Sequence, residues 1–188
     1  MKKIIGKLLI VVGLLIISSV VYINYKTNKN NDDMVKEYET LMLNENETKD
    51  ETTQNIPEGI IGILEIPKLN LKVVVEEGTD NETLKYAVGH FENTVMPGEE
   101  GNFAVAGHRA YTYNKFFSNL DEVKIGDYIN MHTSKGSYRY KVTNSNVVTP
   151  DKVDVLDFID GEKIITLVTC TPKYIGSHRL ILKGELCD

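Results

Sequence analysis

The stretch Ile165–Pro172, which reads ITLVTCTP, places a cysteine at the end of an apolar, β-branched run that a proline then stops. Val, Ile and Thr favour β-strands, and proline cannot donate a backbone hydrogen bond, so we predict a strand over residues 164–169 that ends beside Cys170. Loops meet at strand ends, and sites are often built there. Cys170 is therefore a packed core residue, half of a disulfide or a nucleophile.

Further short β-type runs follow one another over residues 59–188, separated by turn residues. We predict strands at residues 60–66, 71–75, 102–106, 128–133 and 180–183, with a hairpin turn at 134–136. Short helices are predicted after Thr79–Glu82, which has the spacing of a capping box, and over Tyr113–Leu120. Strands at this density, joined mostly by turns, indicate an all-β barrel or sandwich with small helical insertions.

The amino-terminal segment Ile4–Ile23 is apolar over about twenty residues, with one interrupting lysine. At ~1.5 Å per residue this length crosses a hydrocarbon layer of ~30 Å. An uncleaved signal anchor is favoured over a cleaved signal peptide, because the run is long and no A-x-A-like site follows it. By the positive-inside rule, the basic residues near the start place that end in the cytoplasm and the rest of the chain outside: Lys2, Lys3 and Lys7.

Residues 25–58 form a polar and acidic segment between this anchor (residues 1–24) and the folded domain (residues 59–188). Residues 32–58 alone carry a net charge of −7, so we expect a solvated, flexible tether, in which 33–43 (DMVKEYETLML) has a marginal helical period. The whole chain has a net charge of −6 and residues 1–31 contribute +5, which leaves −4 for the domain. A mildly acidic domain without a basic stripe excludes nucleic acid as the expected partner.

The chain has only two cysteines, Cys170 and Cys187, so the domain is not a disulfide scaffold. A bridge between them is not favoured, because Cys187 lies one residue from the carboxyl end, where chains fray. No C-x-x-C or His-x-x-x-His spacing occurs, and we predict no metal site and no required cofactor.

A nucleophilic thiol needs a base or a cation nearby, since a free thiol has a pKa of ~8.5. The chain has four histidines: His90, His108, His132 and His178. His108 is the sharper candidate because it follows the small-residue run FAVAG and opens a loop, although a histidine there could instead cap a turn. Arg179 begins the strand after Cys170, and it returns to the thiol if the two strands pair. There it would either lower the thiol pKa and stabilise an oxyanion, or be an ordinary surface arginine.

Four segments taken together resemble the sortases of Gram-positive bacteria: TLVTC at Cys170, AGHR at His108, HRLIL at Arg179 and GHFENTVMPGEEGN before His108. The resemblance covers residues 59–186. It implies a closed eight-stranded β-barrel, a membrane-anchored enzyme outside the cell, and transpeptidation at an LPxTG-type sorting signal. It also implies that Cys170 is the nucleophile, His108 the acid/base partner and Arg179 the stabiliser of substrate and oxyanion, while His90 matches no catalytic position.

The partners implied by the resemblance are the sorting signal of a surface protein and an amine of a lipid-linked peptidoglycan precursor. The short loop after Cys170 and the sequence Cys-Thr-Pro favour class D, with class A second. Thr169 is expected to assist the oxyanion. An apolar wall for the signal is expected from the loop before the cysteine strand: Val148, Val153, Val155 and Leu156. Some relatives bind Ca²⁺ near this loop, but its acidic residues are expected only to be solvated.

Two alternatives remain open. The domain could be a cysteine peptidase that only hydrolyses the signal, or a non-catalytic surface β-domain in which Cys170 is packed.

Overall fold

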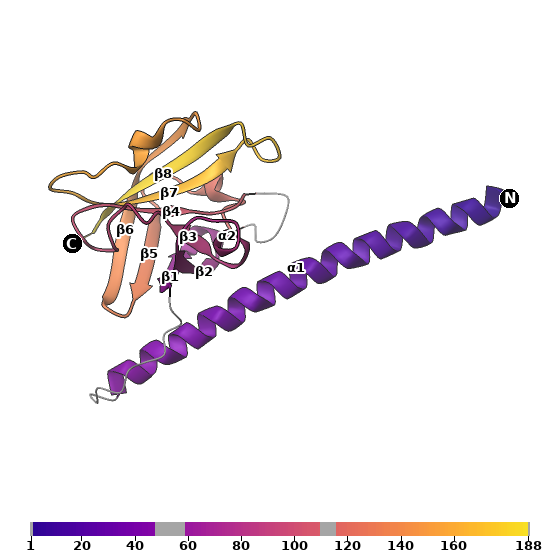
Figure 1. The fold of residues 1–188 in the computed structure, drawn as a ribbon, viewed down its shortest axis with the longest axis horizontal. Coiled ribbons are helices and arrows are strands. Elements are labelled where there is room, and N and C mark those ends of the chain that lie inside the picture. Colours follow the sequence, from indigo (N-terminus) through magenta and orange to yellow (C-terminus); the bar gives the residue numbers. More distant parts are fainter. Residues whose placement is uncertain (1, 48–58, 110–115, 188) are drawn as a thin grey trace.

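The computed structural model describes residues 2–47, 59–109 and 116–187, which form one long helix and a closed β-barrel (Figure 1). The helix α1 spans Lys2–Glu47. The strands are β1 (Ile60–Ile66), β2 (Leu71–Glu77), β3 (Val88–His90), β4 (Gly101–Ala106), β5 (Tyr128–Thr133), β6 (Gly136–Val148), β7 (Lys163–Thr171) and β8 (His178–Leu186). The expected all-β, eight-stranded barrel behind an apolar amino-terminal helix is confirmed.

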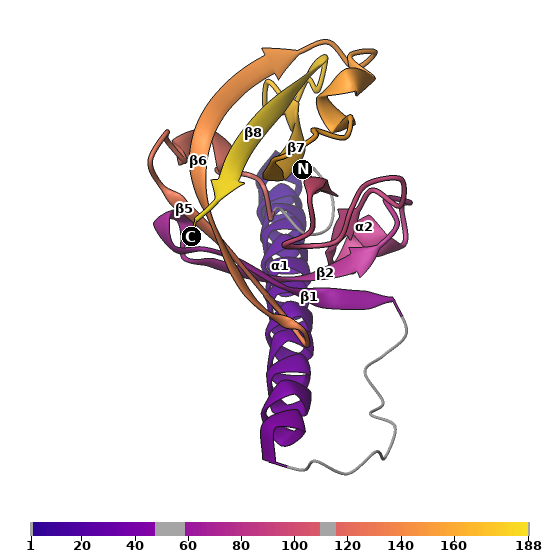
Figure 2. The same cartoon turned by 90° about the vertical axis from the view of Figure 1, so that its left-hand side faces the viewer.

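Around the barrel the strands lie in the order β1-β2-β3-β4-β7-β8-β6-β5, and β5 pairs back with β1. The pairs β2–β3 and β4–β7 are parallel, and the other pairs are antiparallel. In Figure 2 the long strands β6 and β8 curve over the barrel beside β7. This order places the carboxyl ends of β4 and β7 next to each other and next to the start of β8, although they are far apart in sequence.

The barrel interior is filled by alternate residues of the strands, as the two-residue period of a strand requires. The buried cluster contains Leu64 and Ile66 of β1, with further pairs at the same spacing: Val73 and Val75, Phe103 and Val105, Ile165 and Leu167. Each of these side chains is at most 1% exposed. Full burial of one such side chain stabilises a fold by about 1.5–3 kcal/mol, so the core holds the strand ends in place.

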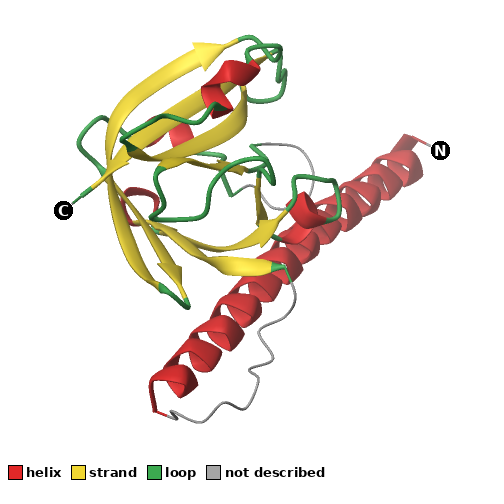
Figure 3. Cartoon of the chain, turned by 60° about the vertical axis from the view of Figure 1, so that its left-hand side comes forward, coloured by secondary structure: helices red, strands yellow, loops and turns green. Residues whose placement is uncertain are grey.

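Within the described residues, four short helical turns lie between the strands (Figure 3): η1 (Pro67–Leu69), α2 (Thr83–Tyr86), η2 (Leu120–Glu122) and η3 (Val153–Leu156). Just before α2, the Oδ1 of Asp80 accepts from the backbone N–H groups of Glu82 (2.8 Å) and Thr83 (3.2 Å). The helix predicted over Tyr113–Leu120 does not form in its described part. Residues 116–119 form turns that lead into η2, and residues 113–115 lie outside the described residues.

The first half of α1 is an exposed apolar helix. Its segment Ile4–Ile23 has a mean hydropathy of 2.7, and none of it is buried against the barrel. Figure 1 shows this half of α1 projecting away from the barrel. Its length and composition are those of a membrane-spanning helix, which suggests membrane anchoring.

The second half of α1 differs from the expected solvated tether, because the helix continues to Glu47. Its apolar stripe packs against the outside of the barrel, where Val35 and Tyr38 form a buried cluster with Ile63 and Val74. Packing of one face stabilises a helix whose charge alone would leave it solvated. The rest of the expected tether, residues 48–58, lies outside the described residues.

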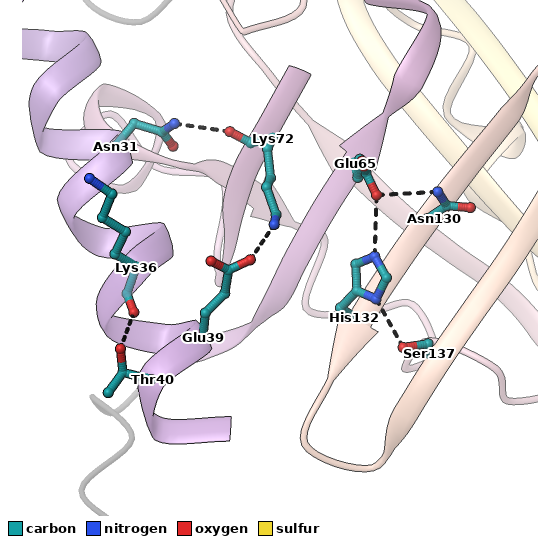
Figure 4. A network of polar contacts seen from close by, with 9 residues as sticks. All are labelled: Asn31, Lys36, Glu39, Thr40, Glu65, Lys72, Asn130, His132 and Ser137. Carbon is teal, nitrogen blue, oxygen red and sulfur yellow. Dashed lines mark hydrogen bonds and ion pairs between the residues drawn. The ribbon is translucent and has the colours of Figure 1, made fainter. Parts of the chain in front are cut away.

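Polar contacts also fix α1 on β2 (Figure 4). The Asn31 side-chain amide donates to the Lys72 carbonyl at 2.9 Å, and the Lys72 ammonium pairs with Glu39. The Tyr38 hydroxyl donates to the carbonyl of Ile61 at 3.3 Å. The second half of α1 is therefore held by contacts to two strands, β1 and β2.

Candidate active site

Cys170 lies near the end of β7, directly opposite Arg179 on the antiparallel strand β8. Side chains directly opposite each other on an antiparallel pair share one face of the sheet. The strand ends one residue later at Thr171, and Cys170 is half-buried. The predicted pairing of the two strands, which returns Arg179 to the end of the sheet where Cys170 lies, is therefore confirmed.

The backbone around His108 is held by hydrogen bonds to β7 and to the turn at residues 116–119. The N–H of Gly107 donates to the Val168 carbonyl (3.1 Å), and the Thr169 hydroxyl donates to the Gly107 carbonyl (2.7 Å). The Phe117 N–H donates to the His108 carbonyl (3.1 Å). A Cβ on Gly107 would lie 2.6 Å from the Phe117 ring, so only glycine allows this approach.

His108 and Cys170 line the same cavity, which has a volume of about 160 Å³. The loop between β7 and β8 forms its far wall. Gly176 in that loop has φ +68°, and a Cβ built on it would lie 3.6 Å from the Cys170 Cβ and 4.0 Å from Sγ. The remaining lining residues are Arg109, Pro172, Lys173, Tyr174 and Ile175.

The ionisable side chains around the thiol are those of His108, Arg109 and Lys173, which line its cavity, and that of Arg179, which lies opposite Cys170 on β8. Burial lowers the pKa of His108 below its ordinary value of 6.5, because the charged ring loses water. Arg179 Nη1 donates to the carbonyls of Gly176 and His178, each at 3.1 Å. A guanidinium has five N–H donors, so Arg179 keeps further donors for a ligand.

A thiol, a half-buried imidazole and an arginine at one end of a closed barrel can perform acyl transfer through a thioester. A sequence model of the family described as "Sortase domain" matches residues 64–187. The chain belongs to the sortase family. Sortases are cysteine transpeptidases, and the predicted family and type of enzyme are thereby confirmed.

Curated relatives include sortases of two classes. Sortase D of Bacillus subtilis (strain 168) is 32% identical over 127 residues, which are 66% of this chain and 62% of that protein. Sortase A of Bacillus anthracis is 30% identical over 199 residues, covering 98% of this chain and 93% of that protein. Both classes named in the sequence analysis are represented, and assignment to class D stays a prediction.

Solved structures share the barrel. A Clostridium perfringens sortase D5 transpeptidase matches with a TM-score of 0.70 and 33% identity, over 85% of this chain and 99% of that one. Sortase A from Corynebacterium diphtheriae, a lid mutant, matches with a TM-score of 0.68 and 31% identity, over 71% and 74% of the two chains.

Arg109 is the residue of this sortase site that sequence reasoning missed. It follows His108 directly and is 5% exposed, although arginine is rarely buried without a partner. Its Nη2 pairs with Asp121 at 2.8 Å, and its Nη1 donates to the Thr171 hydroxyl at 2.6 Å. The signal available in the sequence was an arginine immediately after a small-residue strand and its histidine, in AGHR.

The residues predicted to bind substrate lie in two places. Val148 is directly opposite Arg179 on β6, so Cys170, Arg179 and Val148 form one row across β7, β8 and β6. Adjacent strands are ~4.8 Å apart, which places Val148 about 10 Å from Cys170 across the sheet. The other three lie in η3 and are not among the described lining residues of the thiol cavity: Val153, Val155 and Leu156.

The η3 loop is fixed to the barrel by one buried amide. Asn102 Nδ2 donates to the carbonyls of Val155 (3.0 Å) and Asp157 (3.4 Å), while its Oδ1 accepts from the Thr166 hydroxyl (2.6 Å). Val153 is 68% exposed at the tip of this loop. The loop thus presents apolar side chains on a rigid support.

Thr169 differs in placement from the expected oxyanion group. Its side chain is 2% exposed, and its hydroxyl donates to the Gly107 carbonyl. Successive side chains of a strand point to opposite faces, so Thr169 and Cys170 face opposite ways. The hydroxyl therefore supports the backbone before His108, and an oxyanion role for Thr169 stays an untested prediction.

The other histidines lie outside the thiol cavity. His132, on β5, contacts Glu65 through Nε2 (3.4 Å) and Ser137 through Nδ1 (2.9 Å), as Figure 4 shows. His178 is exposed at the start of β8, and His90 is buried at the end of β3. His108 is thus the histidine that shares a cavity with Cys170.

Both cysteines are free. The Cys187 N–H donates to the Arg139 carbonyl at 2.7 Å, so the residue continues the pairing of the last strand with β6. The disulfide between Cys170 and Cys187, which the sequence did not favour, is absent from the described structure.

Proposed function

We propose that this sortase cleaves an LPxTG-type sorting signal between Thr and Gly through an acyl-enzyme on Cys170, and transfers the protein to an amine of a cell-wall precursor. The observation that supports it is that Cys170 and His108 line one cavity while Arg179 lies directly opposite Cys170. A nucleophile, an acid/base group and a cation are the parts that this acyl transfer uses.

In the first half-reaction the Cys170 thiolate attacks the Thr carbonyl carbon. A C–S bond forms, and the carbonyl π electrons move to oxygen, where Arg179 N–H groups stabilise the negative charge. The tetrahedral intermediate collapses, the C–N bond breaks, and the glycine nitrogen takes a proton from the His108 imidazolium. The products are a thioester on Cys170 and a free amino terminus.

In the second half-reaction the acceptor amine attacks the thioester carbonyl. Neutral His108 takes a proton from the attacking nitrogen, and the C–S bond breaks to return the thiolate. Because burial lowers the pKa of His108, its ring is mostly neutral at pH 7. That form suits the second half-reaction, while the imidazolium needed in the first is a minor form.

The reaction would take place at the outer face of the cell membrane. The apolar segment Ile4–Ile23 would anchor the chain, with Lys2 and Lys3 on the cytoplasmic side and the barrel outside. A membrane-retained sorting signal and a lipid-linked peptidoglycan amine would both be concentrated there. The apolar side chains of Val148 and the η3 loop would receive the Leu-Pro part of the signal.

The test uses an LPxTG-type peptide with a reporter on each side of the Thr-Gly bond, assayed with and without a short amine acceptor. We expect the wild type to give ligated product and ping-pong kinetics, and Cys170→Ala to give neither cleavage nor ligation. Ser137→Ala, on the distant β5–β6 hairpin, is the matched control. Cleavage that never yields ligated product would assign the enzyme to hydrolysis, and retained activity in Cys170→Ala would remove the nucleophile assignment.

A further inference from the structure

The guanidinium of Arg109 connects the segment that carries His108 to the end of β7, which carries Cys170. It belongs to the residue directly after His108, and it reaches β7 at the two positions where that strand ends. Nη1 donates to the Thr171 hydroxyl at 2.6 Å and to the Cys170 carbonyl at 3.4 Å. One side chain therefore connects the backbone of the proposed base to the backbone of the proposed nucleophile.

The same guanidinium also fixes the turn beyond His108. Its Nε donates to the Ser118 carbonyl at 3.5 Å, and the Ser118 hydroxyl donates back to the Arg109 carbonyl at 2.6 Å. The Phe117 N–H donates to the His108 carbonyl, so residues 108 and 109 are both bonded to the turn at 116–119. His108 is thus held between β7 and this turn by contacts on either side.

The charge of Arg109 is balanced at the rim of the barrel. Asp121, at the start of η2, pairs with Nη2 at 2.8 Å and is 51% exposed, whereas Arg109 is 5% exposed. A buried cation without a partner is strongly destabilising. The planar guanidinium of arginine bonds several acceptors at once, which the single ammonium group of a lysine cannot reproduce. These features favour a dedicated geometric role over a chance core ion pair.

A second, weaker contact joins the same two segments. The Lys173 ammonium, in the loop after β7, donates to the Asn119 side-chain carbonyl at 2.9 Å. This contact lies at the exposed surface, where a single bond contributes little. The buried Arg109 contacts therefore set the separation between the β7 end and the His108 turn.

We propose that Arg109 is a positioning residue that holds His108 and Cys170 at the separation that acyl transfer requires. The proposal rests on the proposed function of Cys170 and His108. A displacement of about 1 Å between reacting groups costs about 100-fold in rate. Loss of the Arg109 guanidinium hydrogen bonds should therefore reduce kcat while leaving substrate binding largely intact.

The experiment compares Arg109→Lys, Arg109→Gln and Thr171→Val with the wild type on the LPxTG-type peptide. All these proteins also carry Cys187→Ser, and rates are normalised to the amount of the Cys170 thiol that reacts with iodoacetamide. We expect kcat to fall about 100-fold in both Arg109 variants and about 10-fold in Thr171→Val, with KM changed by less than about 2-fold. Arg139→Lys, an exposed arginine on the hairpin, is the matched control and should keep the wild-type rate.

The pH profile separates positioning from simple stability. A displaced His108 has a changed environment, so the acid limb of the kcat/KM profile should move in the Arg109 variants relative to Arg139→Lys. A wild-type kcat per reactive thiol in Arg109→Lys overturns the proposal, whatever the change in Tm. If both Arg109 variants fail to fold, Thr171→Val decides, and a wild-type rate in that variant also overturns it. Cys170→Ala in the same assay tests the proposed function separately.

Discussion

One Gly-His step ends strand β3 and another directly follows the neighbouring strand β4, and the two histidines have opposite environments. His90 ends β3, is 2% exposed, and has both ring nitrogens bonded, Nδ1 to Glu77 (3.0 Å) and Nε2 to Thr94 (2.9 Å). Its ring stacks on Phe103 with the centroids 5.0 Å apart. His108, two residues beyond β4, lines the cavity with Cys170, and within the described residues its ring makes no hydrogen bond.

The difference shows how one dipeptide acquires two roles. A histidine whose ring nitrogens are both engaged in the core holds strands together and has no nitrogen to offer a substrate. A half-buried histidine in a cavity can exchange a proton, because its ring nitrogens are not engaged by core side chains. The comparison therefore predicts a large effect on activity at one position and on stability at the other.

The largest expected effect is loss of catalysis at His108. General acid–base catalysis contributes about 100- to 10,000-fold, so His108→Asn should lower kcat/KM by an amount in that range with an unchanged Tm. His90→Asn is the matched variant, and its kcat per folded molecule should stay close to that of the wild type. Equal losses of activity in the two variants would break the comparison.

The next effect concerns charge. A carboxylate, Glu77, faces His90, whereas an arginine lies in register with the thiol beside His108. Removal of one oxyanion donor costs about 2.7–4 kcal/mol of barrier, so Arg179→Ala should lower kcat by about 100- to 1000-fold. Arg179→Lys keeps the charge but not the fork and should recover part of the rate. Steady-state kinetics with peptide and acceptor measure both, and full activity in Arg179→Ala would contradict the assignment.

A smaller effect is expected on stability at His90. Replacement by alanine removes the ring contact of the Val95 carbonyl and one of the contacts of the Thr94 hydroxyl, and an unsatisfied buried group costs about 1–3 kcal/mol. Urea unfolding should show this loss for His90→Ala, and a smaller loss for His132→Ala, whose ring is 34% exposed. A His90→Ala variant as stable as His132→Ala would show that the polar cluster is not part of the support of the fold.

The smallest expected effect is the pH dependence of stability at His108. Its folded pKa lies below the unfolded value of 6.5, so the unfolded chain binds the proton more readily. The contribution of His108 is complete above pH 6.5 and is lost as the pH falls from 6.5 through the folded pKa. Since Asn does not titrate, the unfolding free energy of the wild type should therefore fall below that of His108→Asn at acid pH, while the two agree near neutral pH. An NMR titration of the ring with a midpoint above 6.5 would reverse this prediction.

The strands around Cys170 could be predicted because each is long, apolar and ended by a turn residue. The strand β3 could not, since three residues carry no period, and its place is fixed by pairing with β2 and β4. The continuation of β6 to Val148 was also missed. Its residues Asn144–Asn146 are polar and exposed, and they belong to the strand because they pair with β8, which is distant in the sequence.

The candidate site followed the same division. Cys170, His108 and Arg179 were predicted from short motifs in the sequence, and the structure brings them to one end of the barrel. The contacts of Arg109 are with residues up to 62 positions away, and no local pattern reports them. The helical course of residues 25–47 likewise depends on packing against Ile63 and Val74, which their acidic composition does not indicate.

The second half of α1, which packs on the barrel, fixes the distance between the apolar segment and the barrel. From Ile23, the last residue of the apolar segment, to Asn31, which bonds to β2, the helix rises over eight residues, or about 12 Å. A flexible chain of thirty residues would instead let the barrel wander over roughly 30 Å. With the proposed anchor in the bilayer, the Cys170 thiol is held at a fixed distance from the membrane surface. A surface protein then has to present its signal at that height, which makes the spacing between the signal and its own membrane segment a part of recognition.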